Sequence, residues 1–267
     1  MNRMHPDSVL LVTLDSCRYD TFLAAKSPHM KSIGALHRAM APSNFTFGSH
    51  AAIFVGFTPG APEVQAPFVN PKFAKIFKMA PGGLPGMREP FFVLGGRNII
   101  EGFKGNGYRT FGSGAVAWFD PSLPTGTVLT ESFDEFFYPG NPHSLDAQLA
   151  WIDGRIGAMQ EPVFLFLNVG ETHVPYYHKG AEWNPDYNPC QPFGPAENSA
   201  DECRRRQLAC VEYVDFQLAV LLKMFENSTT VICADHGDCW GEDGLWEHGI
   251  SHQKVLEVPL LMRLRGR

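Results

Sequence analysis

Acidic and imidazole side chains follow three apolar runs of this chain, each at the carboxyl end of its run. Asp15 follows the first run, the segment 168–173 follows the second, and Asp235 and His236 follow the third. If these runs are parallel strands of an open sheet, their carboxyl ends meet at one edge, where such sheets bind ligands. Carboxylate and imidazole groups together bind Zn²⁺, Mn²⁺ or Fe²⁺ better than Ca²⁺. The sequence therefore predicts a transition-metal site with Asp15, Asp235 and His236 as ligands.

Thr46 stands just before a short apolar stretch, residues 49–54, whose pattern predicts a helix. A hydroxyl group at a helix N-terminus faces backbone N–H groups and the positive end of the helix dipole, which stabilise an alkoxide and an incoming anion. Two roles are open from the residues alone: Thr46 is either a helix N-cap or a metal-activated nucleophile. Asp15 has the same N-cap alternative, whereas the adjacent pair Asp235–His236 is less easily explained that way.

The elements that must position these residues follow from the hydrophobic pattern. Continuous apolar, β-branched runs are typical of strands buried on both faces of a parallel sheet. Strands are predicted at residues 9–14, 108–112, 163–167, 229–233 and 258–262. Helices are predicted at residues 49–54, 98–104, 145–159 and 201–225. This alternation predicts an α/β fold, a three-layer αβα sandwich around a mostly parallel central sheet. Residues 57–97 are rich in Pro and Gly and show no clear element.

Composition excludes several classes of protein. The 267 residues are 44% hydrophobic, so a sizeable core is expected, and the net charge of −6 argues against a nucleic-acid binder. The six cysteines form no CxxC pair and are expected to be reduced, mostly buried thiols. No apolar stretch has the length of a membrane span or the form of a signal peptide. We therefore expect a cytoplasmic protein with a small-molecule substrate and neither nucleic acid nor membrane as a partner.

These motifs resemble the alkaline phosphatase superfamily, in its sulfatase-like branch. Sulfatases carry Cys or Ser, x, Pro, Ser, Arg, Ala-Ala, two apolar residues and Thr-Gly, and residues 46–56 lie in the same register. Residues 14–16 are similar to the family's first metal-binding strand, and residues 234–260 to its C-terminal block. The resemblance implies one alkaline phosphatase-like catalytic domain over residues 1–267. The family's usual C-terminal subdomain is lacking, so we expect a pocket that is open or completed by a second subunit in a homo-oligomer.

The departures from the sulfatase pattern indicate the chemistry. Sulfatases convert their Cys or Ser to formylglycine, and Thr46 cannot become that group. The resemblance instead implies the phosphodiesterase and phosphotransferase branches, where a Thr-Phe-x-x-His stretch also occurs, with Thr46 as nucleophile and metal ligand. His50 ends this stretch and is expected at the substrate. Ser16 and His236 replace acidic and amide ligands of the sulfatases, which moves the expected ion from Ca²⁺ toward Zn²⁺ or Mn²⁺.

Three further histidines leave a second metal open. His173, His248 and His252 either complete a second metal site or contact the substrate's oxygens and protonate its leaving group. Family positions of similar role match His173 and His248, so the resemblance implies catalytic and substrate-binding roles for these two. The four histidines assigned only structural roles are His5, His29, His37 and His143.

The leading functional expectation is a metal-dependent hydrolase of phosphate or phosphonate esters. Thr46 attacks phosphorus, and the covalent phospho-threonine then passes its group to water. A phosphotransferase or a phosphomutase on the same site is the alternative, and a phosphomutase would need a lid formed by residues 57–97 or 174–203. Thr46 argues against a sulfatase, and the complete ligand set argues against a non-catalytic accessory protein.

Overall fold

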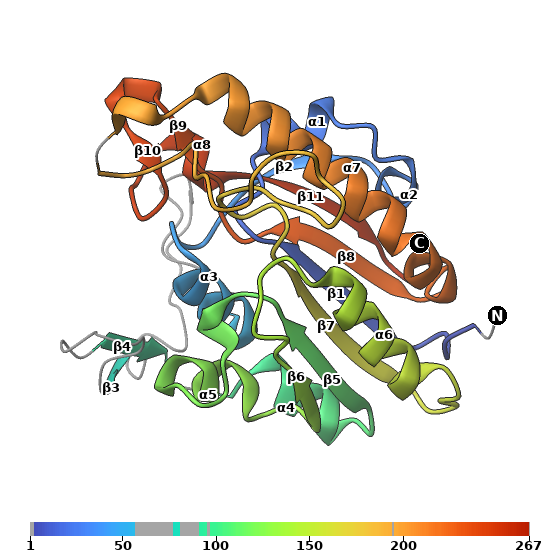
Figure 1. Ribbon diagram of the computed structural model, residues 1–267. Coiled ribbons are helices and arrows are strands. Elements are labelled where there is room, and N and C mark those ends of the chain that lie inside the picture. Colours follow the sequence, from blue (N-terminus) through green and yellow to red (C-terminus); the bar gives the residue numbers. More distant parts are fainter. Residues whose placement is uncertain (1–2, 57–76, 81–90, 95–96, 194, 267) are drawn as a thin grey trace, which may run out of the picture.

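The sheet that carries the site is built around β1 (Val9–Leu14), which is buried along almost its whole length (Figure 1). It pairs in parallel with β7 (Val163–Val169) on one side and β8 (Thr229–Ala234) on the other. Its branched apolar residues suit this place because neither face of a central parallel strand meets water. The computed structural model describes residues 3–56, 77–80, 91–94, 97–193 and 195–266.

Seven strands form this sheet, in the order β2-β11-β8-β1-β7-β5-β6. The bounds of the other four are β2 (His37–Met40), β5 (Arg109–Gly114), β6 (Glu135–Phe137) and β11 (Glu257–Arg263). All pairings among β1, β5, β6, β7 and β8 are parallel, and β11 is antiparallel to β8 and to β2. The five predicted strands and the mostly parallel sheet are confirmed. β2 and β6 were not predicted, because both are short and neither has a continuous apolar run.

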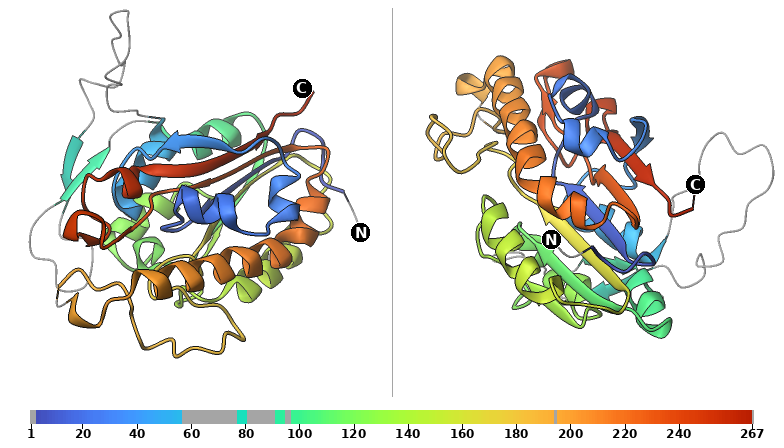
Figure 2. Two further views of the ribbon diagram at one scale, coloured as in Figure 1. Left: turned by 90° about the horizontal axis from the view of Figure 1, so that it is seen from above. Right: turned by 90° about the vertical axis from the view of Figure 1, so that its right-hand side faces the viewer.

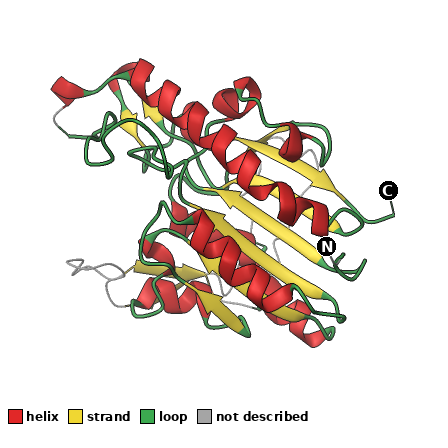
Figure 3. Cartoon of the chain, turned by 45° about the vertical axis from the view of Figure 1, so that its right-hand side comes forward, coloured by secondary structure: helices red, strands yellow, loops and turns green. Residues whose placement is uncertain are grey.

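Helices cover both faces of this sheet (Figures 2 and 3). One face carries α1 (Tyr19–Ala24), α2 (Pro28–Lys31), α6 (Leu145–Ile156) and α7 (Ala200–Met224). The other face carries α3 (Thr46–Val55), α4 (Ile99–Gly105) and α5 (Pro124–Thr130). The short α8 (Gln253–Leu256) leads into β11. This arrangement confirms the predicted three-layer αβα sandwich.

The two faces of the sheet bury separate hydrophobic cores. Side chains of β1 point alternately to the two faces, so this strand contributes residues to both cores. Leu10, Val12 and Leu14 pack into the core beneath α6 and α7, while Leu11 packs into the core beneath α3. The second core is strongly aromatic, with Phe54 and Phe166 in edge-to-face contact at 5.0 Å between ring centroids. Each such fully buried side chain contributes about 1.5 to 3 kcal/mol relative to exposure, so the sheet is held firmly from both sides.

The longest helix, α7, runs the length of one face and holds smaller elements in place. It begins after Ser199, whose hydroxyl oxygen accepts a hydrogen bond from the Glu202 N–H. Its buried Asp215 carboxylate accepts the N–H groups of His29 and Met30 at the start of α2. The predicted helix 201–225 is therefore confirmed within a residue at each end, and its interior acid caps a neighbouring helix.

Two pairs of short strands lie outside the main sheet. β9 (Cys239–Trp240) and β10 (Trp246–Glu247) form an antiparallel pair close to the site, and β3 (Phe77–Ala80) pairs with β4 (Phe91–Leu94). No element was predicted between residues 57 and 97, so β3 and β4 correct that expectation. The rest of the segment lies outside the described residues. Short 3₁₀ turns occur at Ala117–Phe119, Pro195–Glu197 and Glu242–Gly244.

Candidate active site and metal centre

The strand register brings the two predicted carboxylate ligands side by side. Leu14, the last residue of β1, is paired with Ala234, the last residue of β8. The next residue on each strand is Asp15 and Asp235, so both carboxylates leave the sheet at the same level. Both side chains are fully buried. The prediction that separate strand ends converge at one edge therefore holds for these two residues.

A turn with unusual backbone angles at Ser16 and a glycine at position 237 allow the two strand ends to converge. Ser16 has φ 58°, in the left-handed region, which is unusual for a residue with a side chain. In that turn its N–H donates to Asp235 Oδ1 at 3.1 Å and ties the two strand ends together. A Cβ atom on Gly237 would lie 2.4 Å from Lys254 O, so only glycine fits after His236.

Helix α3 brings Thr46 to the same point. The N-cap residue is Phe45, and its side chain caps nothing, so Thr46 is the first helical residue and not an N-cap. The N-cap alternative is therefore excluded by the helix boundary, which lies three residues before the predicted start. Ser49 Oγ donates to the Asp235 backbone oxygen at 2.7 Å and fixes the helix against the end of β8.

The four predicted metal ligands form one compact set. Thr46 Oγ1 lies 3.4 Å from Asp15 Oδ1 and 3.3 Å from His236 Nε2. His236 Nε2 lies 3.5 Å from Asp235 Oδ2 and 3.8 Å from Asp15 Oδ1. A tetrahedral ion with bonds of about 2.0 to 2.2 Å holds its ligand atoms about 3.3 to 3.6 Å apart. The spacing of these atoms fits a transition-metal ion better than direct hydrogen bonds.

The donor chemistry of this set also calls for a cation. His236 Nδ1 lies 3.0 Å from the Gly237 carbonyl, which only accepts, so the proton is on Nδ1 and the Nε2 lone pair faces the acids. The buried Asp235 Oδ2 has no hydrogen-bond partner. Lone pairs from Asp15, Asp235 and His236 thus converge, and a divalent cation satisfies all three. Mixed oxygen and nitrogen ligands favour Zn²⁺ or Mn²⁺.

Burial controls protonation of these ligands in the metal-free chain. Burial and the charge of Asp15 raise the pKa of Asp235 well above its usual range. Burial, with the charge of His248, lowers the pKa of His236 to about 4, which keeps its imidazole neutral and ready to ligate at neutral pH.

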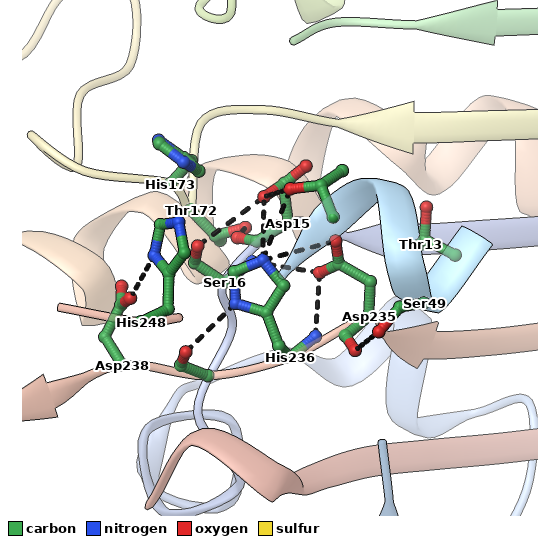
Figure 4. Close-up of polar contacts among 12 residues, drawn as sticks. Thr13, Asp15, Ser16, Ser49, Thr172, His173, Asp235, His236, Asp238 and His248 are labelled. Carbon is green, nitrogen blue, oxygen red and sulfur yellow. Dashed lines mark hydrogen bonds and ion pairs between the residues drawn. The ribbon is translucent and has the colours of Figure 1, made fainter. Parts of the chain in front are cut away.

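His173 and His248 form a second row beside this set (Figure 4). Their ring centroids lie 5.2 Å apart, and the His248 ring lies 4.4 Å from the ring of His236. His173 Nδ1 donates to the Val174 carbonyl, which leaves its Nε2 free to accept or ligate. Burial opposes the charged form of His248, but the hydrogen bond to Asp238 outweighs it and raises the pKa of His248 to about 8. The structure therefore brings both predicted histidines beside the candidate metal ligands.

Two residues at this site were not predicted. Asp238 is fully buried, and its Oδ1 lies 2.8 Å from His248 Nδ1. A signal existed, because Asp238 follows His236 by two positions in the same strand-end segment. His143 has a buried Nε2 without a partner and a ring 5.3 Å from Tyr177. Burial and the charge of His173 lower the pKa of His143 to about 4. Nothing in its local sequence marks it.

Two other predicted histidines are placed elsewhere. His50 is fully buried: its Nδ1 donates to Thr46 O at 2.8 Å, and its Nε2 lies 2.8 Å from Thr13 Oγ1. Both ring nitrogens are engaged, so His50 holds the backbone of Thr46. We had expected this histidine to contact a substrate, and the structure does not place it there. His252 accepts the Lys254 N–H at the start of α8 and contacts Asp243, outside the metal set.

Potential metal ligands form two groups among the described residues. The first is Asp15, Asp235 and His236, and the second is His236, Asp238 and His248. The second metal site suggested by the sequence consisted of His173, His248 and His252. The second group in the structure shares only His248 with that set and contains Asp238 in addition to His236. His252 therefore does not contribute to either group, because its imidazole is used as the N-cap of α8.

A buried arginine fixes the segment that follows the ligands. Arg18, 1% exposed, contacts Asp20 at 2.7 Å and Glu242 at 2.8 Å. Its Nη1 also donates to Asp238 O, and its guanidinium lies 4.0 Å from the centroid of the Trp240 ring. These bonds tie β9 to the turn after β1, so the position of Asp238 depends on residues more than 200 positions away in the chain.

Glu171 is a buried acid behind the site, and its charge should cost stability. Its Oε1 accepts the Leu145 N–H, Oε2 has no partner, and burial raises its pKa from 4.5 to about 7. A pKa raised by folding means that stability is lost as pH rises from 4.5 to about 7. We expect Glu171→Gln to be more stable than the parent at pH 8, by about 1 to 3 kcal/mol, and not at pH 4.5.

Thermal unfolding at the two pH values checks this expectation. Glu182→Gln, at an exposed position, is the matched control and should change neither midpoint. An equal shift of the Glu171→Gln midpoint at both pH values would show that the ionised carboxylate carries no penalty.

Comparison with known proteins defines the class. A family model for sulfatases matches residues 8–267, so the chain belongs to the sulfatase family. One similar solved structure is a protein of the alkaline phosphatase superfamily from Vibrio parahaemolyticus, the superfamily that the motifs predicted. It has a TM-score of 0.56 and 14% identity, and the match covers 100% of this chain and 62% of that one. No curated protein sequence matches this chain.

Similar solved structures include two domains of phosphoethanolamine transferases and the periplasmic domain of an EptC protein. The periplasmic domain of EptC from Campylobacter jejuni has a TM-score of 0.64 and 13% identity, covering 98% of this chain and 82% of that one. The soluble domain of lipooligosaccharide phosphoethanolamine transferase A from Neisseria meningitidis has a TM-score of 0.66 and 14% identity, covering 99% and 79%. The zinc complex of the Escherichia coli EptC periplasmic domain has 0.65 and 16%, covering 98% and 73%.

These structures overturn one expectation from the sequence. Two of the three are periplasmic domains, so the prediction of a cytoplasmic protein, which rested on the lack of a leader segment, is wrong. Among the described residues, no helix has both the length and the apolar character to cross a membrane.

Proposed function

We propose that this chain cleaves phosphate or phosphonate esters through a covalent intermediate on Thr46, assisted by one divalent transition metal. The observation that carries the proposal is the position of Thr46 Oγ1, within 3.3 to 3.4 Å of two ligand atoms at the first residue of a ten-residue helix. A hydroxyl there meets both a metal centre and the positive end of the helix dipole, the conditions that favour an alkoxide facing an anionic ester.

The chain's own residues account for the steps of this reaction. Thr46 Oγ forms the bond to phosphorus while the bond to the leaving oxygen breaks, and His248 or His173 gives that oxygen a proton. In the second step an acceptor attacks phosphorus, Thr46 Oγ leaves, and the same histidines take the acceptor's proton. Asp15, Thr46, Asp235 and His236 would hold the metal, which would lower the pKa of the Thr46 hydroxyl and offset charge on the phosphoryl oxygens.

The acceptor in the second step distinguishes two candidates. Water makes the chain a hydrolase, and another alcohol makes it a transferase. The transferase is the second candidate because two of the similar structures belong to phosphoethanolamine transferases. A sulfatase is disfavoured although the chain belongs to the sulfatase family, because Thr46 cannot form formylglycine.

The experiment uses the full chain, supplied with Zn²⁺ or Mn²⁺. The substrates are four p-nitrophenyl esters: a phosphate monoester, a phosphate diester, a phosphonate ester and a sulfate ester. We expect turnover of phosphorus esters to exceed that of the sulfate ester, and mass spectrometry of quenched reactions to place a phosphorus adduct on Thr46. Added alcohols then decide between hydrolysis and transfer through the products. Faster turnover of the sulfate ester, or an adduct absent from Thr46 in every quenched sample, would contradict the proposal.

His173 and His248 should act on the substrate and leave the first metal in place. We expect either Ala variant to lower turnover by about 10² to 10⁴, the usual range for a general acid or base. Metal analysis should still find one tightly bound ion per chain. His37→Ala, at an exposed position of β2, is the control. Loss of a second equivalent of metal from His248→Ala would identify that histidine as a ligand instead.

A further inference from the structure

The structure assigns a further role to Asp238: we infer that it is a positioning residue that fixes the ring of His248 so that Nε2 is the nitrogen offered to the substrate. The inference rests on the proposed function for the role of His248 in the reaction. It goes beyond that function because no sequence motif singled out Asp238, and because it names the tautomer on which the reaction depends.

Both oxygens of the Asp238 carboxylate are engaged in a buried network. Oδ1 lies 2.8 Å from His248 Nδ1, and Oδ2 accepts the hydroxyl of Tyr176 at 2.7 Å. The Tyr176 oxygen in turn accepts the N–H of Trp240 at 2.8 Å. Tyr176 and Trp240 are themselves buried, so the carboxylate is held from two directions and cannot rotate freely.

This network determines which nitrogen of His248 carries the proton. An ionised carboxylate only accepts, so His248 Nδ1 must donate, and in the neutral ring Nε2 is then the unprotonated nitrogen. Among the described residues, Asp238 is the one hydrogen-bond partner of the His248 ring. Without it, only ring contacts with His173 and His236 hold His248 in the place that Figure 4 shows, and these contacts do not select a tautomer.

The backbone around His248 makes this support necessary. His248 follows Glu247, whose φ of 68° lies in the left-handed region, and precedes Gly249, whose φ is 81°. Left-handed backbone angles on both sides of His248 place it in a tight turn, where no regular helix or strand fixes the orientation of its side chain. Precision at a reacting group comes from its supporting hydrogen bonds, and loss of such a partner typically costs 10- to 100-fold.

The chain contains its own control for this arrangement. His252 Nε2 and Asp243 Oδ2 form a second Asp–His pair at 3.2 Å, but Asp243 is 82% exposed and lies outside the site. Asp243→Asn therefore makes the same chemical change as Asp238→Asn, at a position with left-handed φ of 52° that Asn accepts readily.

The test combines nitrogen NMR with kinetics on the full chain loaded with Zn²⁺. The ¹⁵N shifts are followed to the pH at which they stop changing and the ring is neutral; there they should report the Nδ1–H tautomer for His248, assigned by its loss in His248→Gln. In Asp238→Asn we expect the Nε2–H tautomer, which free imidazole favours in water. Turnover should fall by about 10- to 100-fold with KM changed less than about threefold. Asp243→Asn should alter neither quantity.

A double-mutant cycle separates positioning from general damage. In the His248→Gln background, Asp238→Asn should cost less than about twofold more, because the group it positions is already gone. If Asp238→Asn does not fold, Tyr176→Phe frees the carboxylate and should lower turnover by several-fold.

Three results would overturn the inference: an Nε2–H tautomer in the parent, an unchanged tautomer and turnover in Asp238→Asn, or loss of a metal equivalent in that variant, which would make Asp238 a ligand. If the parent shows no phosphoester activity, the proposed function fails, but the tautomer measurement still decides the role of Asp238.

Discussion

Thr46→Ala should lower turnover of phosphorus esters by about 10⁴-fold or more, because it removes the atom that forms the covalent bond. The fold should survive, since only the hydroxyl and one methyl group are lost at the first turn of α3, and the bond from His50 to the Thr46 backbone remains. Metal content should be largely retained through Asp15, Asp235 and His236. Initial rates, metal analysis and thermal unfolding of the same preparations measure all three.

Two further variants test whether the loss of turnover is specific to the Thr46 hydroxyl. Thr46→Ser keeps the hydroxyl and should retain a measurable part of the turnover together with the covalent adduct. Thr127→Ala removes an exposed hydroxyl from α5 and should behave as the parent. A Thr46→Ala protein that keeps most of its turnover would show that Thr46 is not the nucleophile, whatever its distance from the ligand atoms.

Asp235→Asn should have opposite effects on stability with and without metal. Burial and the nearby charge of Asp15 raise the pKa of Asp235 well above its usual range, and its Oδ2 has no partner. The metal-free chain therefore loses stability as pH rises above the ordinary Asp pKa, because folding opposes ionisation. An amide removes that charge and offers an N–H to the acceptors Asp15 and His236, so the metal-free variant should be more stable, by about 1 to 3 kcal/mol.

With metal the order should reverse. The parent gains free energy of unfolding as RT ln(1 + [M]/Kd), about 4 kcal/mol at a metal concentration 1,000 times Kd, whereas the variant has lost a ligand. Thermal unfolding at pH 8, in chelator and in excess Zn²⁺, measures both effects, with Asp186→Asn as an exposed control. A variant that is less stable than the parent in chelator, or that binds Zn²⁺ as tightly, would contradict the metal centre.

Local patterns in the sequence were enough to predict the strands of the sheet and most of the candidate ligand set. Apolar runs at 9–14, 163–167 and 229–233 are local patterns, and a buried parallel strand needs nothing else to be recognised. Asp15, Asp235 and His236 follow those runs directly, so their convergence depends only on the strands being parallel. The resemblance to the sulfatase-like branch added Thr46, and the structure places its hydroxyl within 3.4 Å of this set.

Tertiary structure decided which of the other polar residues belong to the site. His50 lies four residues from Thr46 on α3, and its imidazole packs in the aromatic core, 4.9 Å from Phe119. His252 caps a helix whose start was not predicted. Of the partners that engage these ring nitrogens, Thr13 comes from a distant strand. The other three, Thr46, Asp243 and Lys254, are near in sequence, but they become partners only once the local helices and turns have formed.

The positions of Asp238 and His143 also could not be predicted from local sequence patterns. Asp238 contacts His248 only because β9 and β10 fold back on each other, and because Arg18 anchors that segment to the turn after β1. His143 approaches Tyr177 because the segments after β6 and after β7 leave the sheet at the same edge. Local periodicity identifies strands and the residues at their ends, whereas contacts between loops depend on packing across the whole chain, and only the folded structure specifies them.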